Sequence, residues 1–75
     1  MIEKKLYFCF KKIFNKKIPK KITNLEMKKF ESWDSLSHMN LMLEIEKKFS
    51  FQFTTKEFAQ LNNYKKIFQR LKNIK

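Results

Sequence analysis

The sequence predicts an all-α fold, a small four-helix bundle with three longer helices and one short third helix. Apolar residues recur at spacings of three and four in separate stretches, and this spacing marks helix faces. Glycine is absent and Pro19 is the only proline, a composition that disfavours tight hairpins. A chain of 75 residues forms one domain, residues 1–75, that buries about 60% of the surface its unfolded chain exposes. Turns that need a positive φ must therefore be made by Asn, Ser or Lys.

The first predicted helix runs from Ile2 to Phe14. Its apolar face is formed by Ile2, Leu6, Phe10 and Ile13. Cys9 lies on the same stretch, where we expect a small buried hydrophobe and not a reactive thiol.

Two irregular segments follow the first helix. Residues 15–21 contain four lysines and Pro19, and they predict an exposed turn. Residues 22–33 carry apolar side chains without a clean period. We interpret them as a long ordered loop that is attached to the core through Ile22, Leu25, Met27, Phe30 and Trp33.

The second helix is predicted to begin with Asp34, Ser35 or Ser37 as its cap and to end near Phe49. Ser50 then ends the helical pattern. The apolar face of this helix comprises Leu36, Met39 or Asn40, Leu41, Met42, Ile45 and Phe49.

The C-terminal third of the chain predicts an extended connector and two further helices. Phe51 and Phe53 alternate with a polar residue, and we expect this connector to place both rings in the core. Thr54 and Glu57 form a capping box before a short helix that reaches about Leu61. Asn62 or Asn63 caps the last helix, whose apolar face holds Tyr64, Ile67, Phe68, Leu71 and Ile74.

These faces together predict one modest core. Its expected members are Leu6, Phe10, Ile13, Leu41, Ile45, Phe49, Phe53, Ile67, Phe68 and Leu71. The same side chains would flank any cleft, and so many bulky rings leave little room for a ligand.

The residue types argue against catalysis and metal binding. A domain of this size has no room for a deep active site, and Cys9 and His38 are the only residues of their kinds. No metal-ligand spacing and no glycine-rich phosphate loop occurs. We therefore expect neither an enzyme nor a metalloprotein. The apolar run at residues 6–10 is too short for a signal peptide or a membrane span, so we expect a cytoplasmic protein.

A motif begins around Ser35 and continues at intervals through the following helix and connector. Asp34-Ser35-Leu36 is followed by Leu41, Ile45-Glu46 and Phe49, and then by Phe51, Phe53 and a short helix. In this spacing, from Trp33 to Leu71, the chain resembles the acyl and peptidyl carrier proteins. The length of the first helix and of the loop after it extends the resemblance over nearly the whole chain.

The resemblance implies that Ser35 accepts 4′-phosphopantetheine, donated from coenzyme A by a phosphopantetheinyl transferase. The thiol of this covalent cofactor would hold acyl or aminoacyl groups as thioesters. A loading ligase and an acyltransferase would then be partners of a monomeric carrier. The family's partner-recognition positions fall on Asp34, Leu36, Met39 and Glu46, and Glu44 adds a nearby carboxylate.

Departures from the family pattern narrow the expected role. Asn40 and Lys47 stand where fatty-acid carriers have Glu, and Ser50 stands where they have Gly. The run Trp33-Asp34-Ser35-Leu36 and its continuation are more similar to stand-alone carriers of surface-polysaccharide, amino-acid or secondary metabolism. The predicted cargo is short or polar.

The net charge of +11 supports an alternative of another class, a basic helical module for nucleic acid or an anionic membrane with Ser35 unmodified. Ser35 would then be only a helix cap. Residues 1–30 carry a net charge of +8 and residues 64–75 carry +5, whereas residues 31–63 carry −2. Because the predicted recognition helix is the least basic part, we do not expect nucleic acid as a partner. We expect the lysines of the first and last helices to form a solvated face. The alternative role is a weak contact with an anionic partner, such as a membrane surface or an acidic enzyme.

Overall fold

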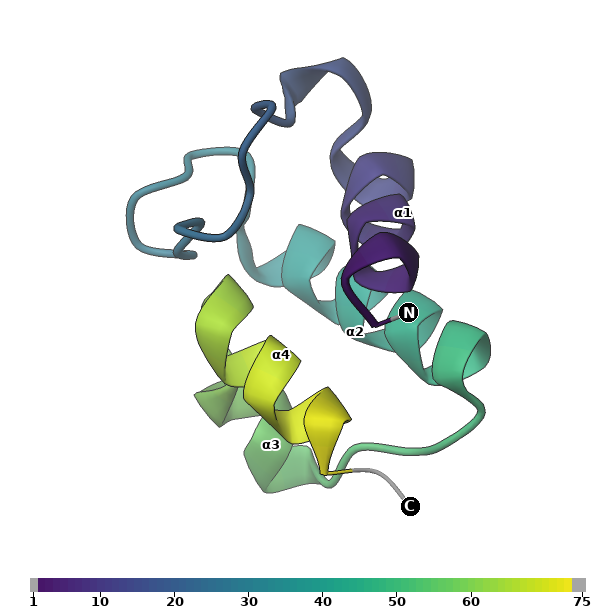
Figure 1. Cartoon of the computed structure of the whole chain (residues 1–75). Coiled ribbons are helices and arrows are strands. Elements are labelled where there is room, and N and C mark those ends of the chain that lie inside the picture. Colours follow the sequence, from purple (N-terminus) through teal and green to yellow (C-terminus); the bar gives the residue numbers. More distant parts are fainter. Residues whose placement is uncertain (1, 74–75) are drawn as a thin grey trace.

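Four α-helices and one short 3-10 helix make up the regular structure of residues 2–73 (Figure 1), which the computed structural model describes apart from the Lys16 side chain. The helices are α1 (Ile2–Phe14), η1 (Asn15–Lys17), α2 (Ser35–Phe49), α3 (Thr55–Gln60) and α4 (Tyr64–Lys72). No strand occurs within residues 2–73. The predicted all-helical class and the order of three longer helices and a short third one are confirmed. The predicted role of Ile74 in the last helix lies outside the described residues.

The helix boundaries follow the caps that the sequence predicts. Asp34 caps α2, and Asn63 caps α4 by accepting a hydrogen bond from a backbone N–H in the first turn. At α3 the Thr54 hydroxyl accepts the Glu57 backbone N–H at 3.1 Å, while the Glu57 carboxylate accepts the Thr54 backbone N–H at 2.9 Å. The capping box is therefore confirmed.

Two non-glycine residues of the described chain adopt positive φ. Asn15 has a φ of 56° directly after α1, and Ser50 has a φ of 55° as the C-cap of α2. Both residue types were expected at such turns because the chain has no glycine. Asn15 also opens η1, so the predicted exposed turn of residues 15–21 begins with a short helix.

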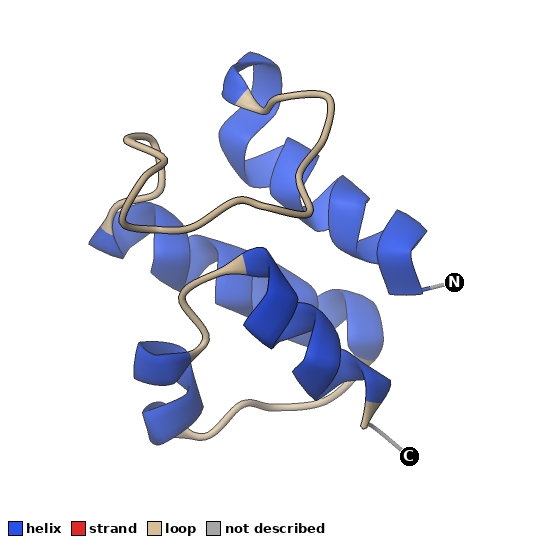
Figure 2. Cartoon of the chain, turned by 60° about the vertical axis from the view of Figure 1, so that its left-hand side comes forward, coloured by secondary structure: helices blue, strands red, loops and turns tan. Residues whose placement is uncertain are grey.

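α1 packs against both α2 and α4 (Figure 2), and the core lies between these three helices. Seven of the predicted core residues are buried: Leu6, Phe10, Leu41, Ile45, Phe53, Ile67 and Leu71. Ile13, Phe49 and Phe68 are only half-buried and pack on its edge. Buried side chains that the prediction of the core left out are Cys9, Phe14, Ile22, Trp33, Met42, Leu61 and Tyr64. The expectation that Cys9 is a buried small hydrophobe is confirmed.

The long loop between α1 and α2 is held to the start of α4. The Met27 backbone N–H donates to the Asn62 carbonyl at 2.9 Å, and the Tyr64 N–H donates to the Leu25 carbonyl at 3.0 Å. Ile22 and Trp33 bury the two ends of the loop. The interpretation of residues 22–33 as an ordered loop is confirmed, and the loop lies beside the N-terminal end of α2 (Figures 1 and 2).

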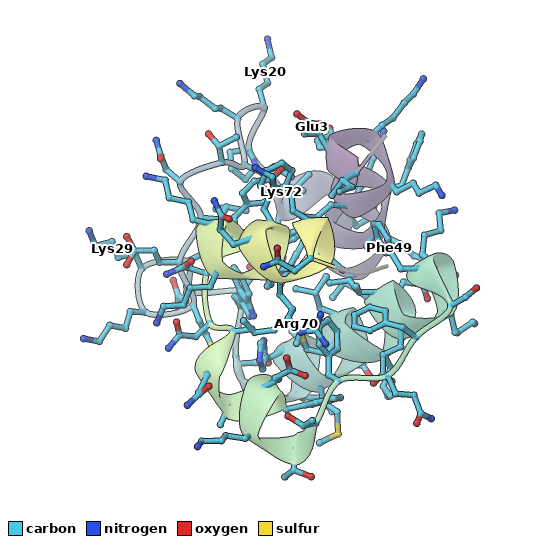
Figure 3. All side chains as sticks on the ribbon, turned by 60° about the horizontal axis from the view of Figure 1, so that its bottom comes forward. Glu3, Lys20, Lys29, Phe49, Arg70 and Lys72 are labelled. Atoms are coloured by element: carbon cyan, nitrogen blue, oxygen red, sulfur yellow. The ribbon has the colours of Figure 1, made fainter. Side chains whose placement is uncertain are left out.

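An ion pair between α3 and α4 fixes the short helix. The Glu57 carboxylate accepts a hydrogen bond from the Arg70 guanidinium, which also lies 5.3 Å from the centre of the Phe51 ring. Figure 3 shows Arg70 extending from α4 across this part of the fold. None of the helices within residues 2–73 is long and apolar enough to cross a membrane.

Candidate functional site

Ser35 is the first residue of α2, and its side chain is exposed. Asp34 fills the capping position, because its carboxylate accepts the Ser37 backbone N–H at 2.9 Å. This hydrogen bond holds the pKa of the Asp34 carboxyl below its usual value. The prediction left three residues open for the cap, and the cap is Asp34. Within the described residues, no side-chain hydrogen bond involves the Ser35 hydroxyl, so helix capping does not account for this serine.

Hydrogen bonds of two buried side chains, Trp33 and His38, fix the backbone on both sides of Ser35. We call this pair the Trp33–His38 relay. The Trp33 indole N–H donates to His38 Nδ1 at 2.9 Å, and His38 Nε2 lies 2.6 Å from the Phe58 carbonyl oxygen. Because an indole N–H can only donate, Nδ1 is the acceptor, and Nε2 donates to the Phe58 carbonyl. The relay joins the end of the loop, α2 and α3 around the serine.

The sequence reasoning gave His38 no role. The available signal was a large indole five residues before the only histidine, since a buried Trp N–H requires an acceptor. Trp33 is 1% exposed and His38 is 8% exposed. The Trp33 ring also packs edge-on against Phe10 of α1, with ring centres 5.3 Å apart. The position of Ser35 is therefore set by the core itself.

An apolar stripe runs along the outer face of α2, directly after Ser35. Its members are Leu36, Met39 and Leu43, which are 71%, 54% and 47% exposed. Their spacing of three and four residues places them on one face of the helix. Leu36 and Met39 were predicted from the resemblance as partner contacts, whereas Leu43 was not. The apolar pattern of α2 had placed Leu36 and Met39 beside buried residues, and this is wrong because the core takes the opposite face.

The two predicted acidic recognition residues of α2 point to other parts of the protein. Glu44 forms an ion pair with Lys12 of α1, with an Nζ–O distance of 3.3 Å, and its side chain is 18% exposed. The Glu46 carboxylate accepts the Phe53 backbone N–H at 2.7 Å and thereby holds the connector before α3. Of the predicted recognition residues, Asp34, Leu36 and Met39 are exposed beside Ser35, while Glu44 and Glu46 are engaged within the fold. Their predicted role in partner recognition stays a prediction.

A cavity of about 400 Å³ opens beside Ser35, between the long loop and the turn before α4. The long loop lines it with Glu26, Met27, Lys28 and Trp33, the start of α2 with Asp34 and Ser35, and the turn with Asn62. A second depression on the other side of Asp34 is lined by Lys17, Glu31, Ser32 and Ser37. The serine hydroxyl therefore lies at the edge of a recess with polar and apolar walls.

Comparison with protein-family models gave no match, and comparisons with curated proteins and with solved structures gave none either. The function has to be argued from the geometry around Ser35 and from the sequence pattern.

Proposed function

We propose that the chain is an acyl or aminoacyl carrier domain, a four-helix bundle of the acyl-carrier type with 4′-phosphopantetheine on Ser35. The observation that carries the proposal is an exposed serine hydroxyl at the first residue of α2 whose capping role is taken by Asp34. Hydrogen bonds of Trp33 and His38 hold the backbone on both sides of this serine, and the exposed hydroxyl is left available for a covalent attachment. A phosphate at a helix N-terminus gains about 0.3–1 kcal/mol from the helix dipole at an exposed site.

The attachment reaction requires only the serine from this chain. Ser35 Oγ would form a bond to the β-phosphorus of coenzyme A, and the bond from that phosphorus to the bridging pyrophosphate oxygen would break. The hydroxyl proton would pass to a base of the transferase, and adenosine 3′,5′-bisphosphate would leave. The chain acts as carrier and not as enzyme, because the loading ligase and the acyltransferase supply the later chemistry.

The apolar stripe supports docking of these partners next to the arm. Leu36, Met39 and Leu43 expose a continuous apolar contact, and such a patch directly after the attachment residue is suited to bringing a partner's active site to Ser35. Because Glu44 and Glu46 are engaged internally, apolar contacts carry most of the binding energy in this proposal. A specialised pathway, a short or polar cargo, a monomeric state and a cytoplasmic location stay predictions from the sequence.

The test is intact-mass measurement after incubation with coenzyme A and a broad-specificity phosphopantetheinyl transferase. The wild type is expected to gain one phosphopantetheine group, and Ser35→Ala is expected to gain none. Ser37→Ala is the matched control, since it removes the nearest other hydroxyl of α2 and leaves Ser35 intact. No gain in the wild type contradicts the carrier function, and a gain that persists in Ser35→Ala moves the site to another residue.

A second candidate function rests on one observation at α1. Phe8 is 49% exposed, and Lys4 and Lys11 lie one turn before and after it on the same outer face. Aromatic and lysine side chains in this order suit an anionic lipid surface. Binding of the unmodified protein to phosphatidylglycerol vesicles but not to phosphatidylcholine vesicles, lost in Phe8→Ser, would support it. Equal sedimentation with both lipids would exclude it.

A further inference from the structure

The cavity beside Ser35 has walls that are fixed before any ligand arrives. Backbone hydrogen bonds join Met27 to Asn62 and Leu25 to Tyr64, so the loop wall and the turn wall cannot separate without breaking them. Met27 and Trp33 are the apolar residues of the cavity lining, and the buried Trp33 indole N–H is bound to His38. A recess that is already formed binds a ligand at a lower ordering cost than one that must close around it.

The charged side chains around the cavity differ in whether another group of the protein already binds them. Glu26 lies 3.7 Å from the Lys29 ammonium, and Asp34 is hydrogen-bonded to the first turn of α2. Lys28 is exposed on the cavity wall, and none of the ion pairs among the described residues includes it. Lys28 is therefore the cation of this wall that is left for an anion on Ser35.

The depression on the other side of Asp34 is less suited to the same anion. Glu31 and Asp34 line it together with Lys17, and none of the ion pairs among the described side chains includes Glu31. Glu26 and Asp34 likewise line the cavity on the Lys28 side, but the Lys29 ammonium lies 3.7 Å from the Glu26 carboxylate and offsets its repulsion of a phosphodiester. The charge distribution around Ser35 therefore favours the Lys28 side.

The size of the cavity limits what it holds. About 400 Å³ is near the lower end of the range of about 300–1,000 Å³ that is typical of small-molecule sites. This volume suits the phosphate and the branched, amide-bearing first part of phosphopantetheine. The distal thiol and its cargo would then remain outside, within reach of a partner on the apolar stripe.

From these observations, and resting on the proposed carrier function, we infer that this cavity is a docking site for the proximal part of the arm. Lys28 pairs with the phosphodiester on Ser35, Asn62 offers polar contacts to the first amide, and Met27 and Trp33 contact the dimethyl carbon. The arm leaves Ser35 towards the long loop and the turn before α4, and not along α2. Lys28 is a positioning residue for the arm.

The experiment compares ¹H–¹⁵N spectra of the apo protein and the phosphopantetheine-loaded protein, after complete loading has been confirmed by mass. We expect shift changes at the backbone N–H groups of Met27, Lys28 and Asn62 and at the Trp33 indole N–H. In Lys28→Gln the changes at Asn62 should fall by at least half. Lys20→Gln removes the same charge from the turn before the long loop, where the Lys20 side chain points away from the fold (Figure 3), and it should keep these changes.

Two results would overturn the inference in distinguishable ways. A fully loaded protein whose shift changes are confined to the first turn of α2, or are equally large in Lys28→Gln and the wild type, contradicts the docking site but leaves the carrier function standing. No mass gain at all contradicts the carrier function, and the docking site falls with it. Lys28→Arg provides a further check, because it keeps the charge and should restore the changes at Asn62.

Discussion

Replacement of His38 by Ala tests whether the Trp33–His38 relay holds the candidate site together. The variant removes the acceptor of the Trp33 indole N–H and the donor to the Phe58 carbonyl in one step. A buried polar group left without a partner costs about 1–3 kcal/mol. Since a water molecule can enter the space that the imidazole vacates, we expect the two groups together to cost about 2–4 kcal/mol.

This loss is large for a domain of this size. A free energy of unfolding of about 0.05–0.15 kcal/mol per residue gives about 4–11 kcal/mol for the whole chain. At about 4–8 °C per kcal/mol, His38→Ala should lower the melting temperature by about 8–32 °C. The assay is thermal and urea unfolding followed by circular dichroism, with Asn40→Ala as the control for an exposed position on the same helix.

A second variant separates the hydrogen bonds from the ring itself. His38→Gln keeps one acceptor and one donor, so it should lose less than half of the stability that His38→Ala loses. A loss below about 0.5 kcal/mol in His38→Ala, the usual effect of a surface substitution, would refute the reasoning. An equal loss in both variants would show that packing and not hydrogen bonding is the source of the effect.

Three further predictions follow from single residues. The Thr54 backbone N–H and then Arg70 hold the pKa of Glu57 below its usual value of 4.5. The stability that this carboxylate contributes is therefore present above that pH and is lost as the pH falls below it. In urea unfolding, the difference in the free energy of unfolding between pH 6 and pH 3 should be smaller in Glu57→Gln than in the wild type. Burial raises the pKa of the Cys9 thiol to about 11, so a disulfide reagent at pH 8 should modify it only after unfolding in urea, and rapid modification of the folded protein would contradict its burial. Leu43→Ser removes a half-exposed apolar contact worth about 1 kcal/mol, so it should raise the KM of the transferase reaction about fivefold and leave kcat unchanged. An unchanged KM would show that Leu43 does not belong to the docking face.

The helices could be predicted because their determinants are local in sequence. The Thr54–Glu57 capping box and the spacing of the α1 face depend on residues within a few turns of each other. The positive φ of Ser50 could be predicted as well, since a chain without glycine must use another small polar residue there. The type and approximate boundaries of the four α-helices were therefore accessible before the structure, whereas η1 was predicted as a turn.

The candidate site could be predicted only in part because its contacts are not local. The serine and the two nearest apolar residues of α2 were named from the motif, but the carboxylate of Glu46 is taken by the Phe53 backbone across a turn that no periodicity describes. Leu43 was missed for a related reason. Which face of α2 stays exposed depends on where α1 and the connector pack, and the sequence pattern of α2 alone allowed a wider apolar face.

The most direct test of the carrier function is the mass of the protein purified from its own cells, followed by fragmentation of the intact chain. The fold leaves the Ser35 hydroxyl exposed and gives the helix cap to Asp34, so the expected result is a population whose fragments carry phosphopantetheine on Ser35. A chain recovered entirely without the group, from cells whose other carrier proteins bear it, would contradict the proposed function.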